Sequence, residues 1–290
     1  MSGSVLGAVR PVAGRRGHQR GMSLVELMIA MVLGLIVLGA AFAVFLSNQR
    51  SYSANEGLNR IQEGARVGLE LISRDIRAAG GSACSSASEV SGDADDVKAF
   101  RDTPVAATAG SLTVTSAEDS AYRLANADAN SITLEADQVE NAEDAFAVGD
   151  VLLLCNARKT FLVTATGVDG QTVTHDGLPA GYDLTSDPYA SLATVSVARF
   201  RRVRWFVADN DRDGRSLFVS RQGANREEVV EGVQGLTLLY RSAGGDYVAT
   251  PVGSNIDAVH VQLTLAGPNI DGAALTRTAS SVVNVRARTL

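Results

Sequence analysis

Three aspartates at alternate positions form the pattern in this sequence that comes nearest to a metal-binding motif. Asp209, Asp211 and Asp213 precede Gly214, as in the first half of a calcium loop. The second half is missing, because the twelfth position holds Ser220 instead of a bidentate glutamate. Such a cluster between strands is also typical of a tight turn. These aspartates are therefore weak calcium candidates, and we expect no metal and no other cofactor.

The sequence lacks the local motifs that usually carry catalysis. It contains no nucleophile elbow, zinc-protease helix, phosphate loop or dinucleotide fingerprint. The 290 residues include 26 Lys+Arg and 32 Asp+Glu, for a formal net charge of −6. An acidic balance argues against nucleic acid as the primary ligand, because few cations are left to neutralise phosphates. We expect a protein that is not an enzyme.

One ionisable residue lies at the edge of a long apolar run, where a charged side chain is energetically unfavourable. Glu26 stands directly before twenty uncharged, apolar or glycine residues, 27–46. As a helix this run would be about 30 Å long, which is the thickness of a bilayer's hydrocarbon core. An unpaired carboxylate at that edge is unfavourable, so it suggests a function. The alternative is a solvated carboxylate in the headgroup layer.

The flanking charge predicts how this segment crosses a membrane. Residues 1–21 hold four arginines and no acid, and the rest of the chain carries 22 Lys+Arg against 32 Asp+Glu. A basic leader keeps its side in the cytoplasm, so the remainder would be exported. The run is too long for a secretory signal and lacks its cleavage site, and a buried core helix would rarely be so uniformly apolar.

The string from Arg20 to Met31 resembles the class III signal of type IV prepilins. The leader charge, Gly21, Glu26 and the apolar run all agree in one register. The resemblance implies cleavage after Gly21 by the prepilin peptidase and N-methylation of Met22. It also implies that Glu26 pairs with the N-terminal amine of a neighbouring subunit in the filament. Major pilins usually begin with Phe, so Met22 points to a low-abundance subunit.

The predicted architecture is α+β, with one long helix followed by an antiparallel sheet. Apolar residues spaced three or four apart continue the helix to about residue 79, where Gly80-Gly81 would end it. We expect a basic leader (1–21), a helix (22–79; transmembrane 27–46, amphipathic 47–79), a loop and variable β-rich insertion (80–193) and a C-terminal sheet (194–290). Residues 80–110 read as loop. The strongest predicted strands are 194–207, 216–221, 228–241, 256–265 and 280–288.

Segments 14–81 and 194–290 are similar to PilW-like minor pilins, notably in the strings at 68–80, 202–209 and 228–241. This resemblance implies a subunit that helps initiate pilus assembly in a minor-pilin tip complex. The implied partners are the prepilin peptidase, other minor pilins, the major pilin, a tip adhesin and the inner-membrane assembly platform. The implied location is the inner membrane, with the head periplasmic, and then the pilus. A pseudopilin of a type II secretion system and a membrane-tethered periplasmic binding module are the alternative hypotheses.

Cys84 and Cys155 are the only thiols in the sequence. The expected topology puts both outside the cytoplasm, where a disulfide is chemically permitted. Such a bond would stabilise the fold by about 4 kcal/mol in the chain-entropy model. Two separate thiols are the alternative.

Overall fold

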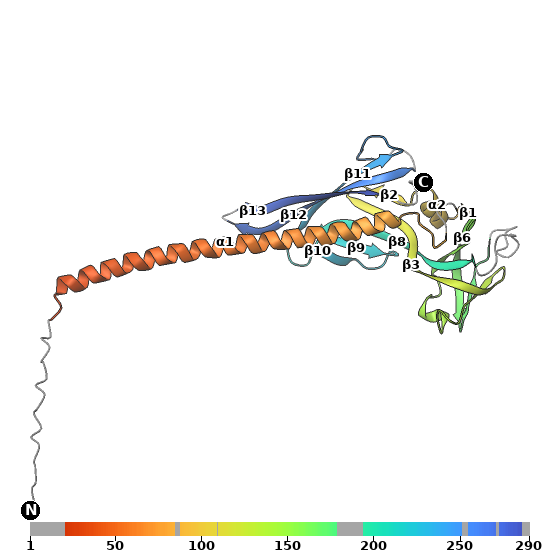
Figure 1. The fold of residues 1–290 in the computed structure, drawn as a ribbon, viewed down its shortest axis with the longest axis horizontal. Coiled ribbons are helices and arrows are strands. Elements are labelled where there is room, and N and C mark those ends of the chain that lie inside the picture. The colour runs from red at the N-terminus through yellow and green to blue at the C-terminus, as the bar shows by residue number, and fades with distance from the viewer. Residues whose placement is uncertain are drawn as a thin grey trace, which may run out of the picture. The chain divides into compact units, whose positions relative to one another are not determined.

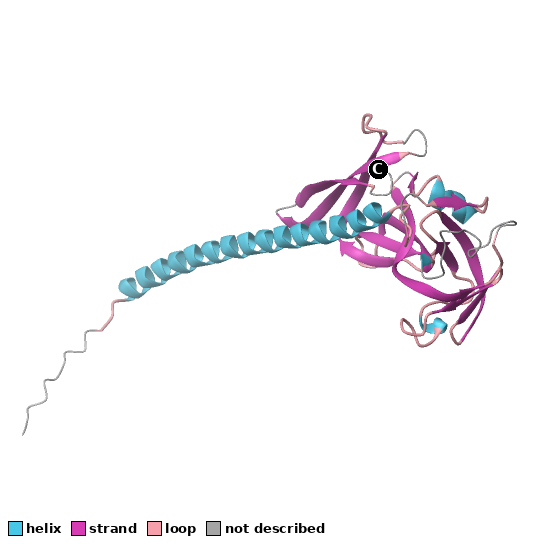
Figure 2. Cartoon of the chain, turned by 45° about the vertical axis from the view of Figure 1, so that its right-hand side comes forward, coloured by secondary structure: helices cyan, strands magenta, loops and turns pink. Residues whose placement is uncertain are grey.

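A computed structural model describes residues 21–84, 88–108, 110–178, 194–250, 255–270 and 273–285. Residues 1–20 of the leader and the end of the strand expected at 280–288 lie outside these residues. The chain divides into two compact units, residues 1–53 and 54–290, and the helix α1 (Leu24–Ala78) contributes to both. In the second unit, residues 54–290, which we call the head, helix and strands pack together (Figures 1 and 2), and this confirms the predicted α+β class.

The second half of α1 packs on the sheets through a narrow face. Ile61, Ala65, Ile72, Ile76 and Ala79 are buried, as their spacing predicts. Helix glycines share that face: a Cβ on Gly64 would stand 2.7 Å from Cγ1 of Val230, so the missing side chain allows the close approach. The helix ends at Ala78, and Gly80 follows with φ of +68°.

The region expected to be loop contains regular structure. Its elements are β1 (Glu89–Ser91), α2 (Asp95–Arg101) and β2 (Val105–Thr108). The prediction of loop was wrong because these elements are too short to show a clear period. Val97 and Phe100 of α2 are buried, so tertiary packing stabilises a helix that would be marginal alone.

The remaining strands form two sheets. They are β3 (Ser111–Ala127), β4 (Ser131–Leu134), β5 (Val151–Cys155), β6 (Lys159–Asp169), β7 (Thr172–His175), β8 (Ser196–Asp209), β9 (Arg215–Arg221), β10 (Glu227–Glu231), β11 (Val233–Ser242), β12 (Ile256–Ile270) and β13 (Ala273–Asn284). The single strand expected at 228–241 is in fact β10 and β11, separated at Gly232, which has φ of +79°. β13 begins well before the residue 280 expected from sequence. The second sheet is β11-β12-β13.

The larger sheet has the order β10-β9-β8-β5-β6-β7-β4-β3-β2, and β3 also pairs with β8. The pairings therefore close a ring through β8, β5, β6, β7, β4 and β3. Its pairs are antiparallel, except that within the described part of the chain β1 joins the sheet in parallel, beside β6. One apolar core fills the ring and includes Leu124, Leu154 and Val173. A second core joins α1 to the strands around it and includes Ile72, Trp205 and Leu263.

Candidate functional site: the helix start and its anchor in the head

The predicted processing site lies where α1 begins. Gly21, Met22 and Ser23 precede the helix, and the Ser23 carbonyl accepts the N–H groups of Glu26 at 3.0 Å and Leu27 at 3.1 Å. Glu26 therefore lies in the first helical turn, where the positive end of the helix dipole favours a carboxylate. Its side chain is exposed, so it is open to a group from another chain.

The helix after Glu26 presents an apolar surface on every side. The large hydrophobic side chains from Leu24 to Leu46 are 42–76% exposed. The helix is long and apolar enough to cross a membrane, and no residue of its most apolar window is buried within the described chain. A core helix of a soluble protein would bury most of that window. This surface therefore requires lipid or other apolar helices around it.

A buried carboxylate fastens the other end of α1 to β8. The Trp205 indole N–H donates to Oδ2 of Asp75 at 2.8 Å, and Arg201 lies 2.9 Å from Oδ1. The side chain of Asp75 is only 5% exposed. Both of its oxygens are thus satisfied by one strand, which fixes the rotation of the helix on the sheet. No local pattern in the sequence reveals this contact; its one signal is an aspartate beside Ile76 on the apolar face of the helix.

The two cysteines are bonded to each other. Cys84 follows the end of α1, and Cys155 is the last residue of β5. The disulfide spans 71 positions of sequence, so it restricts the unfolded chain over a long loop. It ties the segment after the helix to a strand of the closed ring.

Of the aspartates in the weak calcium motif, Asp209 ends β8, and Asp211 and Asp213 lie in the turn before β9. Asn210 makes the main hydrogen bonds within this turn. Oδ1 of Asn210 accepts the N–H groups of Arg212 and Gly214, each at 3.0 Å. The side chains of Asp209 and Asp211 are 90% and 100% exposed, and their nearest cations are Arg215 at 3.5 Å and Arg226 at 4.0 Å. The described residues contain no group of three or more His, Cys, Asp or Glu side chains that could hold a metal.

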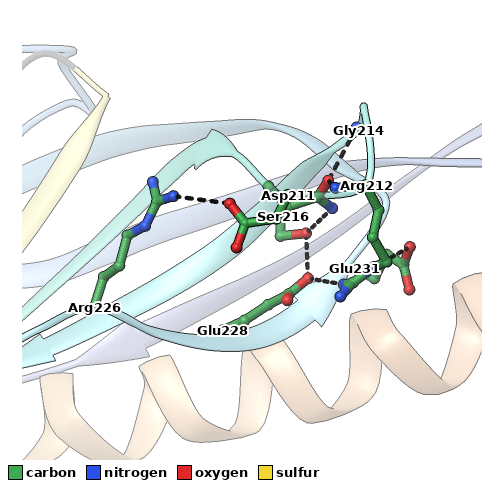
Figure 3. A network of polar contacts seen from close by, with 8 residues as sticks. Asp211, Arg212, Gly214, Ser216, Arg226, Glu228 and Glu231 are labelled. Atoms are coloured by element: carbon green, nitrogen blue, oxygen red, sulfur yellow. Dashed lines mark hydrogen bonds and ion pairs between the residues drawn. The ribbon is translucent and has the colours of Figure 1, made fainter.

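Figure 3 shows how this turn is joined to β10. The Ser216 hydroxyl donates to Oε1 of Glu228 at 2.6 Å, and Arg212 contacts both Glu228 and Glu231. The hydrogen bond from Ser216, followed by that from Arg212, holds the pKa of Glu228 below its usual value. This arrangement stabilises a hairpin and leaves the aspartates dispersed.

The comparisons with known proteins concern the start of the chain. Residues 16–42 match the family described as "Prokaryotic N-terminal methylation motif". No curated protein and no solved structure matches the chain. The motif supports a place in the type IV pilin superfamily and a membrane-anchored, pilin-like chain.

Proposed function

We propose that this chain is a PilW-like minor pilin of a type IV pilus that helps initiate pilus assembly. The observation that carries the proposal is an exposed apolar helix with one carboxylate in its first turn, whose start lies within the matched methylation motif and which is followed by a folded head. A plain membrane anchor does not need Glu26, whereas a subunit that assembles through its helix can use it.

In this proposal, cleavage after Gly21 creates a new amine at Met22, which is then N-methylated. The amine of one subunit meets the Glu26 carboxylate of its neighbour in the apolar filament core. Either charge alone would be strongly disfavoured there, but together they compensate each other. The pair would set the axial register between neighbouring helices.

Helix packing in this proposal depends on small residues. Membrane helices gain little from the hydrophobic effect among themselves, so close contact has to hold them together. Apart from the local backbone of α1 itself, Gly34 and Gly39 have no atom within 4 Å of the position where a Cβ would stand, which leaves space for a neighbouring helix. The head would select the partners: other minor pilins, the major pilin, a tip adhesin and the assembly platform of the inner membrane.

The test replaces Glu26 with valine. We expect E26V to be cleaved like the native chain but to enter pili at least tenfold less, because the neighbouring amine loses its counter-charge. The measurement is the mature N-terminus by mass spectrometry together with the amount of chain in sheared pili. The matched control, E63V, makes the same change on the exposed side of α1 outside the apolar run. Normal incorporation of E26V would refute the role of the carboxylate in assembly.

Deletion of the gene that encodes this chain then distinguishes the role of a minor pilin from that of a pseudopilin. Loss of twitching motility with intact secretion is expected for a minor pilin. Loss of type II secretion with intact motility would overturn the proposal in favour of a pseudopilin. A native chain that retains its leader while the prepilin peptidase is active would exclude both roles.

A further inference from the structure

A groove on the head gathers cationic side chains that the proposed pilin role leaves without a function. It has a volume of about 450 Å³, within the range of small-ligand sites. Arg202, Arg204 and Arg226 line it, together with the polar side chains of Thr113, Ser220 and Asn225. None of the described residues that line it is Asp or Glu, although the chain as a whole is acidic.

The sheet presents these groups on the face opposite to the α1 core. Val203 and Trp205 are buried in that core, so the alternating residues of β8, Arg202, Arg204 and Phe206, point the other way. Arg204 pairs in register with Thr113 of β3 on one side and with Ser220 of β9 on the other. One row across three strands therefore offers a guanidinium between two hydroxyl groups.

The loop after β9 is held over this row by a strained residue. Gln222 has a φ of +51°, which is unusual for a residue other than glycine. Its N–H donates to the Arg202 carbonyl at 2.8 Å, and its side-chain oxygen accepts the Arg202 N–H at 3.2 Å. Its amide group also donates to the carbonyl of Phe200. These bonds keep Asn225 and Arg226 at the edge of the groove.

The aromatic rings hold the guanidinium groups in place. Arg204 lies 5.2 Å from the centre of the Phe206 ring, and Arg226 lies 4.5 Å from that of Phe218. Stacking on a ring restricts an arginine but leaves its N–H edge free for a bidentate oxyanion. Because these ring faces are already covered, they are poor platforms for stacking nucleic-acid bases.

The balance of arginines and carboxylates around the groove favours a ligand with one negative charge in each of its repeating units. Arg202 bonds Asp96 at 2.8 Å, and Arg226 lies 4.0 Å from Asp211. Within the described chain, Arg204 has no carboxylate at ion-pair distance, so the groove has one uncompensated cation. The groove lies on the face of paired strands, β3, β8 and β9, which leaves no free strand edge there for a peptide backbone.

We propose that this groove binds a uronic acid unit of an acidic polysaccharide. The carboxylate would meet the edge of Arg204, and the sugar hydroxyls would meet Thr113, Ser220 and Asn225. This binding does not depend on the proposed pilin role, because it uses only residues of the head.

The test uses the full chain in a sugar-free, non-ionic detergent and isothermal titration calorimetry. Tetrasaccharides of polyuronate are compared with a neutral maltotetraose, a tetraglutamate peptide and a four-nucleotide single-stranded DNA. We expect the uronate probe to bind at least tenfold more tightly than the other three and to weaken as salt increases. Equal binding of the neutral sugar, tighter binding of the peptide or the DNA, or no binding of uronate at millimolar concentration would overturn the proposal.

Variants then locate the site. R204Q should weaken uronate binding at least tenfold and R226Q should weaken it less, because Asp211 already lies near Arg226. R60Q, which removes an exposed arginine of α1, should stay within twofold of the native chain. Both groove side chains face solvent, and circular dichroism checks that each variant remains folded. Unchanged binding in a folded R204Q variant would exclude this groove. If a variant fails to fold, the comparison of the four probes on the native chain still decides the ligand class.

Discussion

At the scale of single residues, the most consequential contact in the head is the carboxylate of Asp75 against Trp205 and Arg201. We expect D75A to lower the free energy of unfolding by about 3 kcal/mol, because it leaves a partly buried guanidinium and a buried indole N–H without their acceptor. Chemical denaturation of the full chain in detergent measures this loss. R74A provides the control: it removes an exposed pair with Asp119 and should cost at most about 1 kcal/mol. Equal losses in the two variants would show that the buried contact has no special role.

A second residue gives the head a defined response to alkali. Tyr240 is 1% exposed, and its hydroxyl has no hydrogen-bond partner among the described residues. Burial raises the pKa of Tyr240 from 10.0 to about 12. Between these two pKa values the folded state keeps the proton while the unfolded state loses it. The free energy of unfolding is therefore undiminished by this group below pH 10 and declines as the pH rises towards 12.

We therefore expect Y240F to reduce the loss of stability between pH 10 and pH 12. At neutral pH the variant should match or slightly exceed the native chain, because an unsatisfied buried hydroxyl is removed. Unfolding curves recorded at several pH values compare the two chains. An identical alkaline slope would show that Tyr240 does not titrate differently on folding.

At the scale of elements, α1 approaches the sheet closely because it has glycines where other helices have side chains. In G64V the new side chain would begin 2.7 Å from Cγ1 of Val230, which is too close for any Cβ. We expect the free energy of unfolding to fall by about 1–3 kcal/mol through overpacking. Q62V introduces the same residue on the exposed side of the helix and should change stability far less. Thermal unfolding of both variants provides the measurement, and a neutral G64V would mean that the helix can move away at little cost.

The helix itself was predictable because its signals are local. The apolar spacing up to Ala79 predicted the buried face, and Gly80-Gly81 predicted its end. Glycine is a weak helix former, so no local signal explains Gly64 and Gly68. Their advantage depends on Val230 and Leu263, more than a hundred residues away. The division of one expected strand at Gly232 was missed for a related reason: its left-handed conformation appears only when the two strands enter different sheets.

At the scale of the whole molecule, the sequence predicted an exported protein of one helix and a sheet, but it did not predict which strands pair with each other. The pairing of β3 with β8, which closes the ring, joins residues such as Thr113 and Arg204 that no local pattern relates. The cationic groove results from the same pairing, so it too was invisible in the sequence. Glu26, in contrast, could be singled out from sequence, because a charge beside a long apolar run is a local anomaly.

The apolar first half of α1 is expected to anchor the whole chain in the membrane of the cell. I36R places a charge near the middle of the twenty-residue run, which should cost about 3 kcal/mol of insertion energy. The share of chain that remains in the membrane pellet after a carbonate wash should therefore fall strongly. Q62R adds the same charge to the exposed part of α1 in the head and should pellet like the native chain, since that part does not enter lipid. If I36R stays in the membrane as firmly as Q62R, the helix is held there by partner proteins that shield the new charge, and insertion into lipid is not what anchors the chain.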